Sequence, residues 1–137
     1  MPSFDDTATT SAPPEEVWKM LYDPSRFPDW WTGFETVEVE SAGADERRYT
    51  MYADGYPELP MPQLLRCSRE DGRVTISCLV SDLVFEWRLD ATSEGTCISV
   101  HVDIPESEAQ RLDGQRDVIS SSLRRLAALA EAGSAAV

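Results

Sequence analysis

The sequence predicts an α+β domain in which an antiparallel sheet curls around one long C-terminal helix. Hydrophobic residues follow a helical period only after Pro13 and again after Glu106, and they alternate at every second position in between. Short turn signals, "EDGR" at 70–73 and "TSEGT" at 92–96, separate consecutive alternating segments. Because a helix of roughly 20 residues is only about 30 Å long, it can pack on a wide sheet only if the sheet curves around it.

Length and composition favour one soluble globular domain. The 137 residues suffice for a hydrophobic core without metal or disulfide support, and 42% of them are hydrophobic. No apolar run approaches the roughly 18–20 residues that span a bilayer, and residues 1–10 carry neither the basic flank nor the apolar run of a secretory signal. We therefore expect a single domain over residues 1–132, a frayed tail over 133–137, no transmembrane segment and a cytoplasmic location.

Charge and cysteine content argue against several classes of partner. The formal net charge is −13, which repels nucleic-acid phosphates, so no nucleic-acid partner is expected. Cys67, Cys78 and Cys97 are odd in number and His101 is the only histidine, so the pattern favours neither a disulfide framework nor a zinc site. Nucleophile-elbow, phosphate-loop and dinucleotide-binding motifs are absent from the sequence. We expect no metal and no cofactor.

The first predicted elements are a strand and two short helices. A β-favouring stretch over 4–11 stops at Pro13 and Pro14, and proline is well tolerated in the first turn of a helix. Four apolar side chains between 17 and 22 then share one helical face. Asp23 and Pro24 end this helix and cap a second one, of one or two turns, that is interrupted or finished near Pro28.

Alternating apolar residues then predict about six antiparallel strands. The clearest groups are Val37 and Val39; Tyr49, Met51 and Ala53; Val74, Ile76, Cys78 and Val80; Phe85, Trp87 and Leu89; and Ile98, Val100, Val102 and Ile104. The segment 54–63 contains three prolines beside Tyr56, Leu59 and Met61, and it predicts a stiff loop. Around Arg66 the alternation is too weak to fix which face of the sheet that side chain takes.

From Glu106 a helical period returns and predicts the long final helix. Its apolar stripe consists of Val118, Ile119, Ser122, Leu123, Leu126, Leu129 and Ala130. This stripe must face the sheet, and the space between helix and sheet is either filled with large side chains or left as a cavity.

Four aromatic residues are concentrated in "DPSRFPDWWTGF", residues 23–34. Phe27, Trp30, Trp31 and Phe34 stand at i, i+3, i+4 and i+7 and would form one helical stripe, although Gly33 could end the helix before Phe34. These rings either fill a core or line a cavity, and the pattern leaves both interpretations open. The same two interpretations apply to Phe85 and Trp87, which share an inward strand face with Leu89.

Polar candidates are few. His101 shares strand parity with Ser99 and Asp103, which predicts a place on the outer face of the sheet, and the same parity argument turns Glu86 and Arg88 outward. Tyr56, Glu58 and Arg66 could reach the rim of a cavity, where an arginine could hold a carboxylate or keto oxygen. An exposed Arg66 on an edge or outer strand is an equal alternative.

The run "SAPPEEVWKMLYDPSRFPDWW", residues 11–31, resembles the opening of the START-like superfamily of polyketide cyclases, dehydrases and lipid-transport proteins (SRPBCC). "EGTCISVHVDIP" and "LRRLAALAE" resemble its end, so the resemblance covers essentially the whole chain. It implies a helix-grip fold: a seven-stranded antiparallel sheet wrapped around the C-terminal helix, closed by the two short helices, with an elongated hydrophobic cavity. It also implies that Phe27, Trp31 and Phe34 lie toward the cavity mouth.

Pattern and resemblance together predict a ligand-binding cavity and leave three functions open. The predicted lining is Phe27, Trp31, Phe34, Tyr49, Met51, Met61, Leu65, Arg66, Ile76, Phe85, Trp87, Ile119 and Leu123. The first hypothesis is binding of a small hydrophobic molecule that is lipid-, polyketide- or isoprenoid-like. The second is a polyketide cyclase/aromatase or dehydratase with a polar pair, including Arg66 or Tyr49, inside the cavity. The third is a protein-interaction or co-chaperone module with an exposed apolar patch. A homodimer also stays open.

Overall fold

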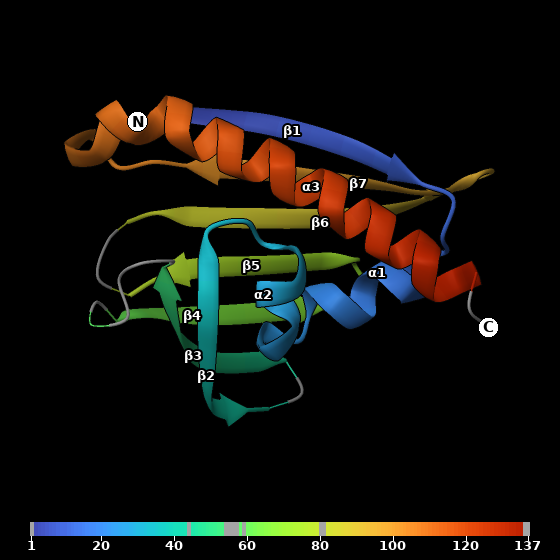
Figure 1. The fold of residues 1–137 in the computed structure, drawn as a ribbon, viewed down its shortest axis with the longest axis horizontal. Helices are drawn as coiled ribbons and strands as arrows, with labels where there is room; N and C mark the ends of the chain where they lie inside the picture. Colours follow the sequence, from blue (N-terminus) through green and yellow to red (C-terminus); the bar gives the residue numbers. More distant parts are fainter. Residues whose placement is uncertain (1, 44, 54–57, 59, 80–81, 136–137) are drawn as a thin grey trace.

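The computed structural model of the chain describes residues 2–43, 45–53, 58, 60–79 and 82–135, and Figure 1 shows one curved sheet gripping a long helix. Along the chain the elements are β1 (Ser3–Thr10), α1 (Pro14–Leu21), the 3-10 turn η1 (Pro24–Arg26), α2 (Phe27–Trp30), β2 (Phe34–Ala42), β3 (Glu46–Ala53), β4 (Met61–Ser68), β5 (Arg73–Cys78), β6 (Val84–Thr92), β7 (Gly95–Asp103), the 3-10 turn η2 (Glu106–Arg111) and α3 (Leu112–Ala135). The predicted α+β helix-grip fold is confirmed.

The sheet is a meander of β2 to β7 with β1 added at the edge beside β7. Its seven strands lie in the order β1-β7-β6-β5-β4-β3-β2, and every neighbouring pair is antiparallel. Register shifts interrupt the pairing of β2 with β3 between Phe34 and Thr36 and again between Val39 and Ser41. Bulges of this kind bend a strand and increase its twist, and in Figure 1 β2 crosses the view at a steep angle to β5. The curvature that the sequence argument required is therefore concentrated at this end.

The helix α3 crosses the concave face of the sheet and contacts β1, α1 and α2 (Figure 1). Two hydrogen bonds join it to the α2 region: the Thr32 amide donates to Ser122 Oγ over 2.9 Å, and Arg125 Nη2 donates to the Asp29 carbonyl over 2.7 Å. The buried face of α3 consists of Ile119, Ser122, Leu123, Leu126, Ala127 and Ala130. The short aromatic helix is thus fixed against the long one.

The predicted loop over 54–63 is wrong at its end, because β4 already begins at Met61. Pro62, the second residue of β4, lacks an amide hydrogen, but its carbonyl still accepts a hydrogen bond from the Leu79 amide over 2.9 Å. Proline is tolerated near the start of a strand for this reason. The predictions on Tyr56, Leu59 and Val80 lie outside the described residues.

Three smaller expectations need correction. The helix α3 continues to Ala135, so residues 133–135 are helical where a frayed tail was predicted, and residues 136–137 lie outside the described part. Leu129, placed in the apolar stripe, is 37% exposed because it lies at the margin of the buried face, whereas Ala127 points inward. Val39 is 42% exposed because β2 is the edge strand beyond the helices.

His101 lies on the outer face, as predicted, between two carboxylates. Its Nδ1 is 2.7 Å from Asp5 Oδ1 on β1, and its Nε2 is 3.0 Å from Asp103 Oδ1 on its own strand. The hydrogen bond with Asp5, followed by the contacts with Asp103, outweighs partial desolvation and raises the pKa of His101 above its usual 6.5. The imidazole therefore joins β1 to β7, and its protonated form is favoured relative to a free histidine.

This site predicts a pH dependence of stability. Because the folded pKa of His101 is raised, its contribution is complete below the unfolded pKa and is lost as pH rises through the folded pKa. The variant His101→Gln should therefore lose less stability than the wild type between pH 6 and pH 8.5, as measured by urea denaturation at several pH values. Equal pH slopes for the two proteins would contradict the assignment. Comparing slopes removes the general effect of the net charge of −13.

Candidate functional site

The aromatic segment leaves its helix earlier than the spacing of its rings suggested. Asp23 caps η1, since its Oδ1 accepts from the Ser25 amide over 3.1 Å, and α2 then makes a single turn from Phe27 to Trp30. Trp31 is already extended at φ −82° and ψ 107°. Gly33 follows with φ +95°, a left-handed value that favours glycine. Phe34 consequently belongs to β2, and the predicted stripe of four rings on one helix is wrong.

Trp31 nevertheless lies at the centre of an aromatic cluster. Its ring centroid is 5.3 Å from Phe27, 5.3 Å from Trp30, 5.9 Å from Phe34, 5.0 Å from Phe85 and 5.5 Å from Trp87. The last three contacts are edge-to-face, the arrangement that ring quadrupoles favour. The Trp31 side chain is 2% exposed. The cluster joins the α2 segment to the inner face of β6 and supplies a rigid aromatic wall.

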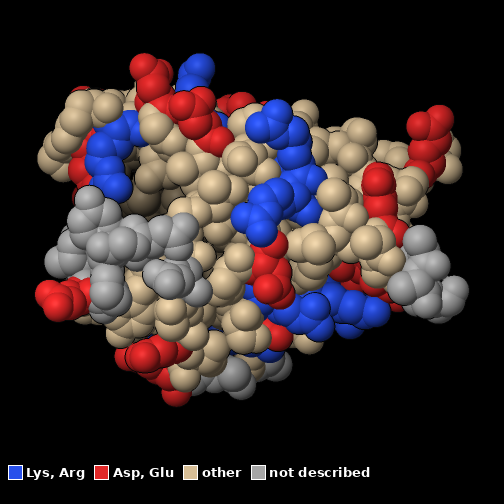
Figure 2. Space-filling view, in the orientation of Figure 1, with Lys and Arg blue, Asp and Glu red and all other residues tan. Residues whose placement is uncertain are grey.

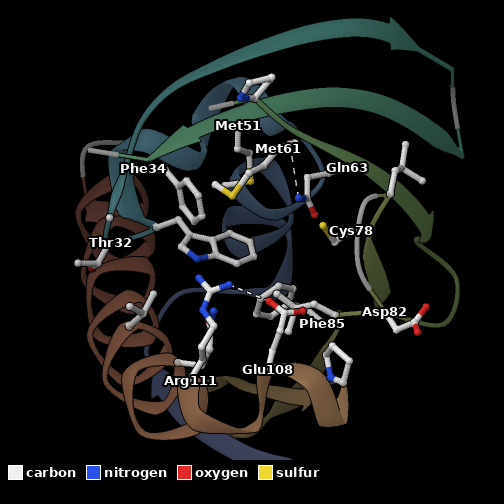
Figure 3. Close-up of a pocket in the computed structure, with 18 of the residues that line it drawn as sticks. Thr32, Phe34, Met51, Met61, Gln63, Cys78, Asp82, Phe85, Glu108 and Arg111 are labelled. Atoms are coloured by element: carbon white, nitrogen blue, oxygen red, sulfur yellow. Dashed lines mark hydrogen bonds and ion pairs between the residues drawn. The ribbon is translucent and has the colours of Figure 1, made fainter. Parts of the chain in front are cut away.

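On the other side of this wall lies a pocket with a volume of about 1180 Å³. Figure 3 shows it between the β3–β6 face and the η2–α3 segment. Its lining consists of Trp31, Thr32, Gly33, Phe34, Met51, Pro60, Met61, Gln63, Cys78, Leu79, Asp82, Leu83, Phe85, Pro105, Ser107, Glu108, Arg111, Gln115 and Val118. In Figure 2 a hollow is visible beside the first turns of α3. The pocket is open to solvent on that side.

An ion pair lies on the helix side of the pocket. Arg111 Nη1 is 2.8 Å from Glu108 Oε1, and their side chains are 55% and 23% exposed. Figure 3 shows both side chains pointing into the pocket, across from Met51 and Met61. Because the Arg111 guanidinium is exposed, the pair places a hydrogen-bonding group at the rim and contributes little to stability.

The sheet side of the pocket carries polar groups of a different kind. Gln63 on β4 is 6% exposed, and Cys78 lies at the end of β5. Behind them, Tyr49 on β3 is fully buried. Desolvation, with a smaller effect from Cys78, raises the pKa of the Tyr49 hydroxyl well above its usual value. Tyr49 therefore remains a neutral phenol that can donate a hydrogen bond.

The structure divides the predicted cavity residues into three groups. Trp31, Phe34, Met51, Met61 and Phe85 belong to the pocket lining. A second group is buried in the core and does not belong to the lining: Phe27, Tyr49, Leu65, Ile76, Trp87, Ile119 and Leu123. The helices cover that part of the concave face completely, so these side chains pack against one another. The ligand role of the first group stays a prediction.

Arg66 forms the third group, and its inclusion among the cavity residues was wrong. Gln63 and Leu65 have buried side chains on β4, whereas the Arg66 side chain is 71% exposed and lies 3.5 Å from Glu46 on β3. Strand alternation therefore turns Arg66 to the outer face. Of the two other rim candidates, Glu58 is exposed and Tyr56 lies outside the described residues.

Several polar residues of the lining were not predicted from the sequence, among them Gln63, Cys78, Glu108 and Arg111. Gln63 was missed because the weak alternation of β4 does not show which side chains face inward. Cys78 was treated only as a small apolar residue on the inner face of β5. Glu108 and Arg111 have the i, i+3 spacing of a helical ion pair, which is a signal for contact but not for proximity to a pocket. Their place depends on how η2 returns from β7 across the sheet.

Other kinds of site find no support in the part of the chain that is described. No set of three His, Cys, Asp or Glu side chains gathers there as metal ligands. Cys67, Cys78 and Cys97 are not joined by disulfide bonds. Within the same residues, no helix is long and apolar enough to cross a membrane.

Comparison with known proteins agrees with this architecture. The family described as polyketide cyclase / dehydrase and lipid transport matches residues 1–131, whereas no curated protein matches. The ZhuI aromatase/cyclase of Streptomyces sp. R1128 superposes with a TM-score of 0.81 at 17% identity, covering 95% of this chain and 93% of that one. A protein from Thermus thermophilus superposes with a TM-score of 0.77 at 17% identity, and the match covers 97% of this chain and 99% of that one.

A third similar structure is the di-domain aromatase/cyclase StfQ of the steffimycin biosynthetic pathway. It superposes with a TM-score of 0.79 at 15% identity, and the match covers 98% of this chain but 52% of StfQ. At these identities, the three structures establish a shared fold.

Proposed function

The chain belongs to the polyketide cyclase / dehydrase and lipid transport family, and we propose that it binds a small hydrophobic or aromatic molecule in the pocket beside Trp31. The observation that carries the proposal is a pocket of about 1180 Å³ with a preformed aromatic wall. Ligand sites typically occupy about 300–1,000 Å³ and are lined mainly by apolar and aromatic side chains. Lipid-, polyketide- and isoprenoid-like compounds are the classes of ligand that this lining suits.

The apolar character of the wall supports this class of ligand over a polar metabolite. Trp31, Phe34, Phe85, Met51 and Met61 all line the pocket, and Figure 3 shows the two methionines beside Phe34. Methionine adapts to irregular ligands and makes favourable sulfur contacts with rings. A flat apolar molecule could therefore lie against the rings and the thioethers.

Equilibrium dialysis with 2-methylnaphthalene tests the proposal. We expect saturable binding and an increase in thermal stability, because a ligand at 100 times its dissociation constant adds about 2.7 kcal/mol. Val118→Trp, which places an indole in the pocket wall from α3, should weaken binding about tenfold. Leu129→Trp is the matched control on an exposed position of the same helix. Absence of binding, or equal affinity for both variants, would count against the proposal.

The rim ion pair predicts opposite effects from two neutral substitutions. With 2-naphthoate as the probe, Arg111→Gln should weaken binding by about threefold to fivefold, because the carboxylate loses a guanidinium donor at an exposed site. Glu108→Gln should strengthen it by a similar factor, because it removes a like charge. Fluorescence titration measures both. Arg116→Gln, an equal change of charge outside the pocket lining, should leave the affinity unchanged. Shifts of the same sign for Arg111→Gln and Glu108→Gln would contradict this role of the pair.

Polyketide cyclase or dehydratase activity is a second candidate. What favours it is that Gln63 and Arg111, which can donate hydrogen bonds to a keto oxygen, lie in an otherwise apolar pocket together with Glu108, whose carboxylate could accept a proton. Arg66 cannot be part of such a pair because it faces outward. Incubation with a poly-β-keto substrate should change the product mixture relative to buffer if this candidate holds, and an identical mixture would remove it.

A protein-interaction role has less support. Among the described residues, the large hydrophobic side chains that are exposed are Val39, Leu79 and Leu129, at 37–46%. They lie on β2, just beyond β5 and on α3, so they do not suggest one contiguous patch of the kind that marks an interface. The homodimer considered from the sequence stays untested.

A further inference from the structure

Three polar side chains form a row across the inner face of the sheet. Tyr49 on β3 is paired directly with Gln63 on β4, and Gln63 is paired with Cys78 on β5. Side chains at directly paired positions have Cβ atoms about 4.5–5.5 Å apart. Met51 and Leu65 are buried at flanking inward positions. A further inward position on β3 is Arg47, whose guanidinium lies 4.8 Å from the centre of the Tyr22 ring. Polar groups are therefore concentrated at one level of a largely hydrophobic surface.

The row has unused hydrogen-bonding capacity. Tyr49 is fully buried, and its hydroxyl has no hydrogen-bond partner among the described residues. Gln63 is 6% exposed, and within the same part of the chain its amide nitrogen reaches only the Met61 carbonyl, at the long distance of 3.5 Å. A buried polar group without a partner costs about 1–3 kcal/mol. Phenylalanine and leucine would avoid this cost, so the two side chains are suited to a partner that the described residues do not provide.

Two of the three members of the row line the pocket. Gln63 and Cys78 belong to the pocket lining, and Figure 3 shows them side by side on the sheet side, away from Arg111 and Glu108. Tyr49 lies one strand further, near enough to Cys78 for the two groups to interact electrostatically. A ligand that fills the pocket would thus bring its sheet-facing end to Gln63 and Cys78, and Tyr49 is the directly paired neighbour of Gln63.

We propose that Tyr49, Gln63 and Cys78 form a subsite for a neutral carbonyl or hydroxyl oxygen at the sheet-facing end of the ligand. The proposal rests on the proposed function and narrows it to oxygenated apolar compounds. The phenol and the amide N–H donate, the amide oxygen accepts, and the thiol is a weak donor. None of the three is a cation, and a carboxylate buried without a cation would be strongly disfavoured. A neutral oxygen is therefore the group that fits.

A matched pair of probes tests the subsite. 2-Naphthol and 2-methylnaphthalene have nearly the same shape and differ by a hydroxyl in place of a methyl group. In a purely apolar pocket the hydrocarbon would bind more tightly, because the hydroxyl loses its hydrogen bonds to water. With the subsite, 2-naphthol should bind about tenfold more tightly, the value of one net hydrogen bond of about 1–1.5 kcal/mol.

Single substitutions in the row test whether Tyr49 and Gln63 cause the tighter binding of 2-naphthol. Tyr49→Phe and Gln63→Leu should each reduce the advantage of 2-naphthol severalfold and leave the affinity for 2-methylnaphthalene unchanged, as measured by equilibrium dialysis. Tyr52→Phe is the matched control, because Tyr52 is on the same strand but its hydroxyl faces Glu38 on the outer side. Tyr49→Phe should be as stable in urea as the wild type, or more stable, because it removes a buried hydroxyl that has no partner among the described residues.

The outcomes separate this inference from the proposed function. Equal or weaker binding of 2-naphthol than of 2-methylnaphthalene by the wild type would overturn the subsite and leave the hydrophobic pocket intact. A clear loss of stability in Tyr49→Phe would also overturn it, because the hydroxyl would then serve the fold. Failure of both probes to bind would refute the proposed function itself.

Discussion

Replacement of Trp31 by alanine is expected to lower the free energy of unfolding by about 3–5 kcal/mol, the range for truncating a buried tryptophan. Small domains have a total stability of about 5–15 kcal/mol, so the variant should be close to unfolding at physiological temperature. The physical reason is that this ring contacts five others, from Phe27 to Trp87, and is 2% exposed. Urea denaturation measures the loss.

A matched pair of milder variants separates the core role of Trp31 from its pocket role. Trp30 is also fully buried and its Nε1 donates to the Met20 carbonyl over 3.1 Å, but it does not belong to the pocket lining. Trp30→Phe and Trp31→Phe should both lose stability. The affinity for 2-methylnaphthalene should fall only in Trp31→Phe. Equal affinities in the two variants would show that Trp31 is merely a core residue.

Replacement of Gly95 by alanine is expected to cost about 3 kcal/mol or more, from backbone strain together with steric overlap. Gly95 begins β7 with φ +148°, and a Cβ there would overlap the Thr10 carbonyl oxygen and the Ser11 backbone. These atoms belong to the chain as it leaves β1 toward α1, so the substitution would separate the β6–β7 hairpin from the end of β1. Thermal and urea denaturation would report the loss.

Gly114→Ala is the control for this prediction. Gly114 lies in α3, and a Cβ at this position would meet no atom within 4 Å. Alanine is favoured over glycine in a helix by about 1 kcal/mol, so this variant should be slightly more stable than the wild type. If Gly95→Ala were as stable as Gly114→Ala, the close approach of the hairpin to the end of β1 would be wrong.

The fold could be predicted from the sequence because its signals are local and agree with one another. The alternation of Phe85, Trp87 and Leu89, the capping pair Asp23 and Pro24, and the helical period after Glu106 each specify an element without reference to the rest. β4 was the exception. Pro62 and a polar Gln63 obscured its alternation, and its strand character comes from pairing on both sides with β3 and β5.

The pocket could be predicted only in part, because a cavity depends on what the fold leaves empty. Trp31 and Phe85 were identified as large inward side chains, yet Trp87, two residues along the same strand, packs entirely in the core. The difference is set by how far α2 and α3 cover the concave face, which is a long-range property. The position of Arg111 at the rim is also a long-range property, because it depends on the direction that η2 takes after β7.

The central claim is that a small apolar molecule occupies the pocket lined by Trp31 and the two strand methionines. NMR of the protein labelled with ¹³C in its methionine methyl groups tests it most directly, with 2-naphthol as the probe. We predict intermolecular NOEs from the ring protons to the methyl groups of Met51 and Met61, which line the pocket, and none to Met20, which is buried in α1 outside it. A bound probe without NOEs to Met51 and Met61, or with NOEs to Met20 alone, would contradict the claim.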